Sequence, residues 1–274
     1  MGDSTRREQP WTPEPLDVDG LQRLLTTRTL GRTLHMKTQT TSTNDDAKQL
    51  ARHGASQGTV VLAEQQHRGR GRQGRSFTSP AGVGIYMSLL LRPEIEISRL
   101  PQLTLVAAVA TADAIAEVSA LSVELKWPND VMIRNRKAGG ILTESVFQAD
   151  RSPVAIVGIG INVNTALEQF PPELRHQVTS LALTAGRFVS RPSLIAAILN
   201  RLEPLYHTFQ QQGLAPILPH WLHYGRIAGK PVRCSTARGV EEGVVLGLDE
   251  DGALLVRRRD SSRLRVVSGE VTFL

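Results

Sequence analysis

The chain has 274 residues, 41% hydrophobic and 21% charged, which suits one main domain with a small appendage and a sizeable core. Its formal net charge of +6 suits an anionic partner, such as a nucleotide, an acidic protein or a nucleic acid, without choosing among them. The single cysteine, Cys234, excludes an intramolecular disulfide and a multi-cysteine zinc site. Because the sequence has neither an apolar run of about eighteen residues nor the layout of a secretory signal, we expect a cytoplasmic protein without a membrane partner.

Helical and strand patterns follow one another along most of the chain. Residues 1–15 are polar and rich in proline, which predicts a disordered lead-in. Helical patterns, one of them capped by a Ser-Thr-Asn cluster, cover parts of 16–30, 45–54, 100–121 and 191–213. Strand patterns cover 59–66, 84–93, 123–133, 138–147 and 153–164, and a polar RNRK turn joins the third to the fourth.

From residue 228 the chain changes character. Short alternating strand patterns replace the helical ones, and the DEDG sequence at 249–252 predicts a tight turn. These features indicate a small all-β module, which we expect to be a barrel. The predicted organisation is therefore the lead-in, a main domain over 16–227 and a β-barrel domain over 228–274.

A glycine–arginine loop, RGRGRQGR at 68–75, lies between two predicted core strands. Glycine permits positive φ angles and close backbone approach, so N–H groups can turn toward an anion, while arginine offers forked donors to carboxylates and phosphates. Alternative interpretations are a solvated basic loop or an RGG-like RNA tract. An RGG tract is usually repeated within a disordered region, whereas this single copy lies between core strands. The pattern therefore favours a small anionic ligand.

Three further motifs follow downstream. In KWPND (126–130) the proline makes a rigid bend that presents polar side chains at a strand break. In KAGGIL (137–142) a lysine precedes two glycines, so its ammonium group could reach a ligand lying against bare backbone. GIGINVN (158–164) lacks the third glycine of a dinucleotide fingerprint, and we expect outward-facing Asn162 and Asn164 beside a flat ligand. Since no P-loop is present, phosphate handling by arginine and glycine indicates adenylate-forming chemistry.

Five motifs in order resemble those of the biotin protein ligases. They are TSTND (41–45), EQQHRGRGRQGR (64–75), KWPND (126–130), KAGGILTE (137–144) and VGIGINVN (157–164). The resemblance implies an α+β fold: a mixed β-sheet with flanking helices, like the catalytic domain of class II aminoacyl-tRNA synthetases, plus a C-terminal SH3-like barrel. It implies that biotin and ATP, with Mg²⁺, form biotinyl-5′-AMP. The biotinyl group then passes to one lysine of the biotin carboxyl carrier protein domain of a carboxylase.

The resemblance also assigns site residues. Biotin binding falls to Ser42, Thr43, Asn44, Gln66, Gly69, Arg70, Gly71, Arg72 and Lys137. Nucleotide binding falls to Arg72, Arg75, Phe77, Lys126, Asn129, Lys137, Asn162 and Asn164. Catalytic roles fall to Lys137, Arg70, Arg72 and Asp130, with Asp130 also the candidate magnesium ligand. The chain departs from the family at His67 and Arg68, where a small residue is common, and at Phe77, where tryptophan is usual; a phenylalanine still offers a face to adenine.

The sequence leaves three rival hypotheses to test. One is a lipoate or octanoate transferase of a related fold, another a basic nucleic-acid-binding protein, and the third a degenerate ligase that only binds biotin. Fewer than forty residues precede the catalytic motifs, too few for the helix-turn-helix domain of some family members, so we expect no DNA-binding domain. We expect a monomer or a homodimer, since an edge strand near 157–164 could pair with a second copy.

Overall fold

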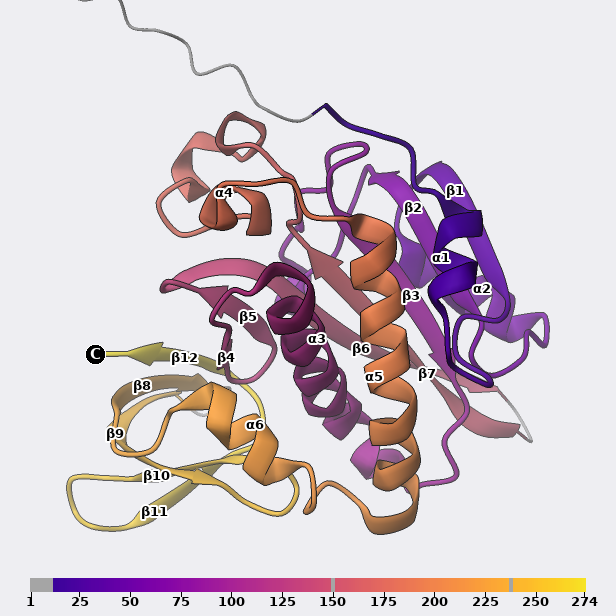
Figure 1. Cartoon of the computed structure of the whole chain (residues 1–274). Helices are drawn as coiled ribbons and strands as arrows, with labels where there is room; N and C mark the ends of the chain where they lie inside the picture. Colours follow the sequence, from indigo (N-terminus) through magenta and orange to yellow (C-terminus); the bar gives the residue numbers. More distant parts are fainter. Residues whose placement is uncertain (1–11, 149–150, 237–238) are drawn as a thin grey trace, which may run out of the picture.

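The computed structural model describes residues 12–148, 151–236 and 239–274. Its main domain is built on a seven-stranded mixed sheet with the order β1-β2-β3-β7-β6-β5-β4 (Figure 1). The strands are β1 (Leu34–Thr40), β2 (Val60–Gln66), β3 (Ile85–Leu91), β4 (Glu124–Lys126), β5 (Asp130–Ile133), β6 (Arg136–Gln148) and β7 (Arg151–Ile161). β1 and β2 are parallel, and every other neighbouring pair is antiparallel. The predicted mixed sheet is confirmed.

Helices cover both faces of this sheet. They are α1 (Val18–Leu24), α2 (Thr43–Arg52), α3 (Leu103–Ser119), α4 (Leu181–Ala185), α5 (Arg191–Gln212) and α6 (Leu218–Gly225). Short 3-10 turns lie at Arg72–Gly74, Ile97–Gln102, Leu167–Gln169 and Pro172–Leu174. α3 and α5 lie side by side in front of the sheet in Figure 1.

The alternation of strand side chains separates two cores. Leu89 and Leu91 of β3 belong to the large core that includes α3 and α5. Leu90, between them, packs with Ala47 and Ala51 of α2 in a second, smaller core. Because successive side chains of a strand point to opposite faces, α2 covers the face opposite α3 and α5. Every second residue of β3, β6 and β7 therefore faces the space beside α2.

One expectation from the sequence is wrong. The segment near 157–164 is not an edge strand, because β7 is hydrogen-bonded to β3 on one side and to β6 on the other. No helical pattern was predicted for α6, which begins at Leu218 with Pro219 in its first turn. Proline is tolerated there, since the first N–H groups of a helix have no partner within the helix.

One helical stretch, Ile97–Ser119, has the length and apolar character of a membrane span. In its most apolar window 72% of the residues are buried inside the fold, where α3 packs against the sheet and α5. This burial matches the long core helix that the alanine-rich spacing predicts.

The C-terminal module is a five-stranded antiparallel sheet that is consistent with a small barrel. Its strands are β8 (Pro231–Thr236), β9 (Gly239–Leu248), β10 (Leu254–Arg257), β11 (Arg263–Val266) and β12 (Glu270–Phe273), in the order β11-β10-β9-β8-β12. It docks on the main domain through Gly252, whose carbonyl accepts a 3.0 Å hydrogen bond from the indole of Trp127. A Cβ at Gly252 would lie 2.3 Å from Leu105, so this contact requires glycine.

The start of the described chain lies against the main domain. The buried guanidinium of Arg191 forms a 2.7 Å ion pair with Glu64 and donates a hydrogen bond to the carbonyl of Glu14. The other carboxylate oxygen of Glu64 accepts a hydrogen bond from the backbone N–H of Leu16. Residues 12–15, part of the predicted lead-in, are thus tied to the end of β2.

A carboxylate of α5 holds the loop before β1. Glu203 accepts three backbone hydrogen bonds of 2.7–2.9 Å from residues 28–30. Burial alone would raise its pKa, but these bonds and the charge of Arg32 outweigh burial and hold the pKa below its ordinary value of 4.5. We expect Glu203→Gln to lower the free energy of unfolding at pH 7 by about 1–2 kcal/mol, because hydrogen bonds to a charged acceptor are strengthened.

The pH dependence checks this role. A lowered folded-state pKa means that the stabilisation is present above pH 4.5 and is lost as the pH falls through the folded value. Denaturant melts should therefore show the difference between Glu203→Gln and the wild type shrinking below about pH 4.5. The exposed Glu173→Gln serves as control, and a difference independent of pH would contradict the assignment.

Candidate functional site

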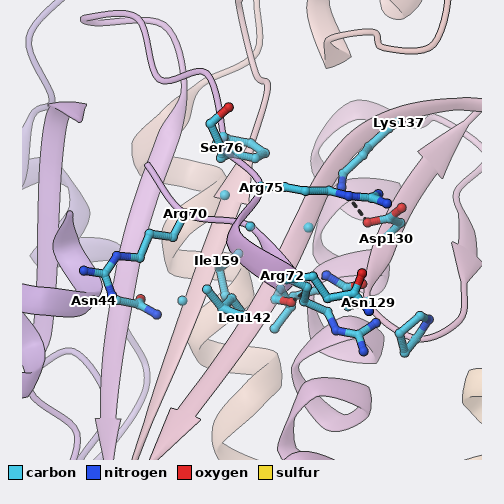
Figure 2. Close-up of a pocket in the computed structure, with 18 of the residues that line it drawn as sticks. Asn44, Arg70, Arg72, Arg75, Ser76, Asn129, Asp130, Lys137, Leu142 and Ile159 are labelled. Carbon is cyan, nitrogen blue, oxygen red and sulfur yellow. Dashed lines mark hydrogen bonds and ion pairs between the residues drawn. The ribbon is translucent and has the colours of Figure 1, made fainter. Parts of the chain in front are cut away.

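A pocket opens on the α2 face of the sheet, beside the first half of β6 and the end of β7 (Figure 2). Its floor includes two glycines, and each leaves room for a neighbouring side chain. A Cβ at Gly158 would lie 2.3 Å from Oδ1 of Asn44, and one at Gly160 would lie 2.9 Å from the ring of Phe77. The sequence pattern predicted bare backbone beneath a flat ligand. In the structure, the bare backbone of Gly158 and Gly160 accommodates the side chains of Asn44 and Phe77.

The polar end of the pocket is formed by the start of α2. Gln66 Oε1 accepts a 2.9 Å hydrogen bond from the backbone N–H of Thr43 and a 3.2 Å bond from its hydroxyl. The buried Ser88 hydroxyl donates to Asn44 Oδ1 at 2.5 Å. Ser42 holds the N-cap position, yet its side chain makes no capping bond, so the expected side-chain cap is wrong. Ser42 instead lines the pocket beside Thr43 and Asn44.

The glycine–arginine loop folds as a hairpin, named here the lid (residues 69–77). Gly71 N–H donates to the Arg75 carbonyl at 2.7 Å, and Phe77 N–H donates to the Gly69 carbonyl at 2.8 Å. Gly69 is required for close packing, because a Cβ there would lie 2.3 Å from the Phe77 carbonyl oxygen. Gly74, with φ of 75°, uses the positive φ that glycine favours, and Gln73 before it also has a positive φ, of 55°.

Cations dominate the charged groups that line the pocket. Five basic side chains face two acidic ones: Arg70, Arg72, Arg75, Lys126 and Lys137 against Asp130 and Glu270. This excess of positive charge suits an anionic ligand. Lys137 lies beside the bare backbone of Gly140, and its Nζ lies 2.6 Å from Asp130 Oδ1.

The lid is held from the C-terminal module. Arg75 forms a 2.5 Å ion pair with Glu270 of β12, and this pair holds the pKa of the Glu270 carboxyl below its ordinary value. Arg72 donates to the Gly269 carbonyl at 3.4 Å. Burial lowers the pKa of Arg72, although the charges of Asp130 and Glu270 oppose the shift. The wall formed by Gly269, Glu270 and Val271 was missed, because no local pattern shows that β12 returns to the lid.

The pocket brings most of the predicted site residues together. The lining includes Ser42, Thr43, Asn44, Gln66, Arg70, Gly71, Arg72, Arg75, Phe77, Lys126, Asn129, Asp130 and Lys137. Gly69 packs behind the lid instead. Asn162 and Asn164 are buried rather than outward-facing as expected, and their amides donate to the carbonyls of Thr179 and Val189. They brace the chain that leaves β7, and neither lines the pocket.

Metal-binding groups are sparse in this part of the molecule. Within the described residues, no three His, Cys, Asp or Glu side chains gather closely enough to hold an ion. Asp130 and Glu270 are the carboxylates among the pocket-lining residues. Mg²⁺ commonly takes one or two carboxylates together with substrate phosphates and water, so this donor set fits an ion that arrives with a phosphate ligand.

The floor supplies a test of the geometry. We expect Gly158→Ala to raise the KM of the ligand bound at the polar end by about ten- to a hundredfold, because the added Cβ displaces the Asn44 amide. Steady-state kinetics with each substrate varied in turn will measure it. Gly54→Ala is the matched control: its φ of 84° strains alanine, but it lies outside the pocket lining. An unchanged KM in Gly158→Ala would refute the role given to this contact.

A floor that includes bare glycine backbone, a polar end wall and a cationic lid define a binding site for an anionic ligand. The profile of the Biotin/lipoate A/B protein ligase family matches residues 36–164, and that of the biotin protein ligase C-terminal domain matches residues 227–274. The first runs from within β1 to beyond the end of β7 and includes the lid, and the second contains the module that closes the pocket.

Relatives agree along nearly the whole chain. The bifunctional ligase/repressor BirA of Bacillus subtilis is 38% identical over 90% of this chain and 76% of its own length. A biotin–[acetyl-CoA-carboxylase] ligase of Paracoccus denitrificans is 34% identical over 87% of this chain and 99% of its own. The structure of the Aquifex aeolicus biotin protein ligase in complex with biotin and ATP superposes with a TM-score of 0.77, at 30% identity over 89% of this chain and 99% of its own. The chain belongs to the biotin protein ligase family.

Proposed function

We propose that this protein activates biotin with ATP to biotinyl-5′-AMP and transfers the biotinyl group to a lysine of a biotin carboxyl carrier protein domain. The observation that carries the proposal is the convergence of Lys137 and the lid arginines on one pocket with a polar end wall. The Aquifex relative, with biotin and ATP in its structure, supports the choice of ligands. The acceptor is inferred from carboxylase-directed relatives such as that of Paracoccus.

The proposed ligand lies along the floor. Its ureido ring meets Thr43, Asn44 and Gln66, and its carboxylate reaches toward Lys137 and Arg70. Phe77, held edge-on to Tyr86 at 6.4 Å, offers a ring face to adenine. Asn129 and Lys126 then lie on the nucleotide side.

In the first step, a carboxylate oxygen of biotin attacks the α-phosphorus of ATP, and the bond to the β-phosphate oxygen breaks to release pyrophosphate. Two anions must approach each other, so fixed cations stabilise the transition state more than the separated reactants. Lys137 and Arg72 supply that charge. Mg²⁺, held by Asp130 together with phosphate oxygens, would add positive charge on the nucleotide when bound.

In the second step, a neutral lysine amine of the carrier attacks the carbonyl carbon of the mixed anhydride, and AMP leaves with the bond electrons. Asp130 is positioned to orient the amine, since its carboxylate lines the pocket beside Lys137. The lid excludes water that would otherwise hydrolyse the anhydride. We place this reaction in the cytoplasm, where Cys234, buried and unpaired, stays reduced.

Mass spectrometry of a purified carrier domain tests the proposal. With biotin, ATP and Mg²⁺, we expect one lysine to gain one biotinyl group, and no gain without ATP. A parallel reaction with lipoate separates the related acyl transfer, and modification by lipoate alone would overturn the proposal. Oligonucleotide binding with steep salt dependence and no ATP turnover would indicate the nucleic-acid-binding alternative instead.

A further inference from the structure

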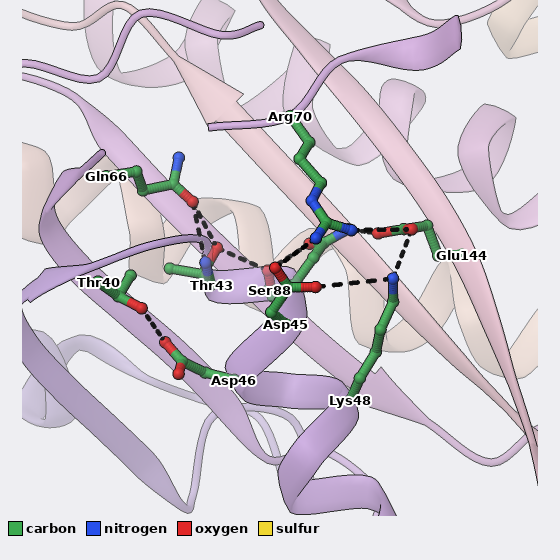
Figure 3. Close-up of polar contacts among 10 residues, drawn as sticks. Thr40, Thr43, Asp45, Asp46, Lys48, Gln66, Arg70, Ser88 and Glu144 are labelled. Carbon is green, nitrogen blue, oxygen red and sulfur yellow. Dashed lines mark hydrogen bonds and ion pairs between the residues drawn. The ribbon is translucent and has the colours of Figure 1, made fainter. Parts of the chain in front are cut away.

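A charge cluster adjoins the polar end of the pocket, centred on Glu144 of β6 (Figure 3). Glu144 Oε2 accepts a 2.7 Å hydrogen bond from Asn44 Nδ2, and Oε1 lies 2.5 Å from Lys48 Nζ of α2. Glu144 is not among the residues that line the pocket. It lies one layer behind Asn44 on the same face of the sheet.

This cluster keeps Glu144 ionised. Burial would raise the pKa of its carboxyl, but hydrogen bonds from Lys48 and Asn44, with the charges of Lys48 and Arg70, hold the pKa below its ordinary value. An ionised carboxylate only accepts hydrogen bonds, so Asn44 must turn its NH₂ group toward Glu144. Asn44 Oδ1 then faces the Ser88 hydroxyl, which donates to it. The two neighbours together fix which way the amide points.

The same cluster reaches the lid. Arg70 Nη2 lies 2.5 Å from Asp45 Oδ2, and its Nη1 lies 3.8 Å from Glu144 Oε1. Lys48 lies between the two carboxylates, 3.9 Å from Asp45 Oδ1. Glu144 thus contacts both Asn44, at the polar end of the pocket, and Arg70, the first arginine of the lid.

We propose that Glu144 is a positioning residue for biotin: by fixing the Asn44 amide, it sets how tightly the pocket holds the ureido ring, without touching the ligand. This inference rests on the proposed function and adds the determinant of ring recognition. A ureido ring presents N–H donors on either side of a carbonyl acceptor, so an amide pointing the wrong way would oppose donor to donor. The ionised Glu144 carboxylate excludes that second orientation of the Asn44 amide.

Biotin-dependent exchange of label between pyrophosphate and ATP tests the proposal. We expect Glu144→Gln to raise the KM for biotin about tenfold or more, because the glutamine amide can both donate and accept and no longer orients Asn44. The KM for ATP and the kcat should stay within about twofold of wild type. Glu144→Asp, which keeps the charge on a shorter side chain, should recover part of the affinity. Glu117→Gln is the matched control, an acid ion-paired to Arg201 at 2.8 Å on α3.

A double-mutant cycle decides whether Glu144 acts through Asn44. In an Asn44→Ala background, Glu144→Gln should change the KM for biotin by less than about twofold. Full, independent effects of the two substitutions would overturn the proposal, as would an unchanged KM for biotin or an equal rise for biotin and ATP. A fall in Tm without a selective rise in the KM for biotin would show that Glu144 has only a structural role. If Glu144→Gln does not fold, the same kinetic measurement is made on Glu144→Asp. Absence of exchange in the wild type would instead reject the proposed function itself.

Discussion

Lys137→Ala is expected to lower the rate of biotinyl-adenylate formation at least about a hundredfold, on the order of 3 kcal/mol. The Lys137 ammonium lies beside the bare backbone of Gly140. There it can stabilise the negative charge that develops between carboxylate and phosphate. Its removal also leaves Asp130 without its 2.6 Å ion-pair partner, which adds negative charge where the ligand is anionic. Single-turnover formation of biotinyl-AMP gives the rate directly.

Two variants make this prediction specific. Lys137→Arg keeps the charge but changes its shape, so we expect a rate between those of wild type and Lys137→Ala. Lys37→Ala removes a lysine that is ion-paired to Asp46 at 2.7 Å outside the pocket lining, and should leave the rate unchanged. Near-normal adenylate formation in Lys137→Ala would refute the catalytic role.

Arg72→Gly is expected to release biotinyl-AMP early, so that lysines of bystander proteins become labelled. The Arg72 side chain anchors the lid to the Gly269 carbonyl and lines the pocket beside Asp130. Glycine at this position removes the anchor and also loosens the hairpin backbone. The lid then opens while the mixed anhydride is intact, and any nearby amine can react with it.

Tryptic mass spectrometry after incubation with carrier domain and serum albumin measures this leakage. We expect biotinylated albumin lysines with Arg72→Gly and almost none with wild type. Arg68→Gly, the same change at an exposed arginine before the lid, is the control. Labelling that stays confined to the carrier lysine would show that Arg72 does not sequester the intermediate.

Local patterns predicted the elements that depend on local chemistry. Apolar residues at helical spacing predicted α3 and α5, and apolar runs predicted β2 and β3; α3 is buried along most of its length. The RNRK turn joins β5 to β6 as predicted, with positive φ at Arg134 and Asn135. α6 was missed because proline usually ends a helical pattern, whereas Pro219 lies in a first turn.

Long-range contacts explain the rest. Ordered motifs identified the lid, KWPND and KAGG as parts of one site, but they did not show that Asn164 lies buried against Val189. Nor does sequence separation reveal that Glu270 meets Arg75 or that Glu144 meets Asn44. Each of these contacts joins segments far apart in the chain, so the tertiary fold decides them.

β7 is hydrogen-bonded to a strand on each side, so the floor of the pocket is held differently from the lid. Gly158 is hydrogen-bonded into the ladder between Ser88 of β3 and Leu142 of β6, so the floor keeps its shape from one turnover to the next. The lid is joined to the sheet by its two ends and held by side-chain contacts, such as that of Arg70 with Glu144 of β6. On the proposed function, we expect the floor to select among acids of different length and width, and the lid to govern the residence time of the ligand. A ligase with altered acyl preference should accordingly be sought by substituting floor residues such as Leu142, leaving the arginines intact.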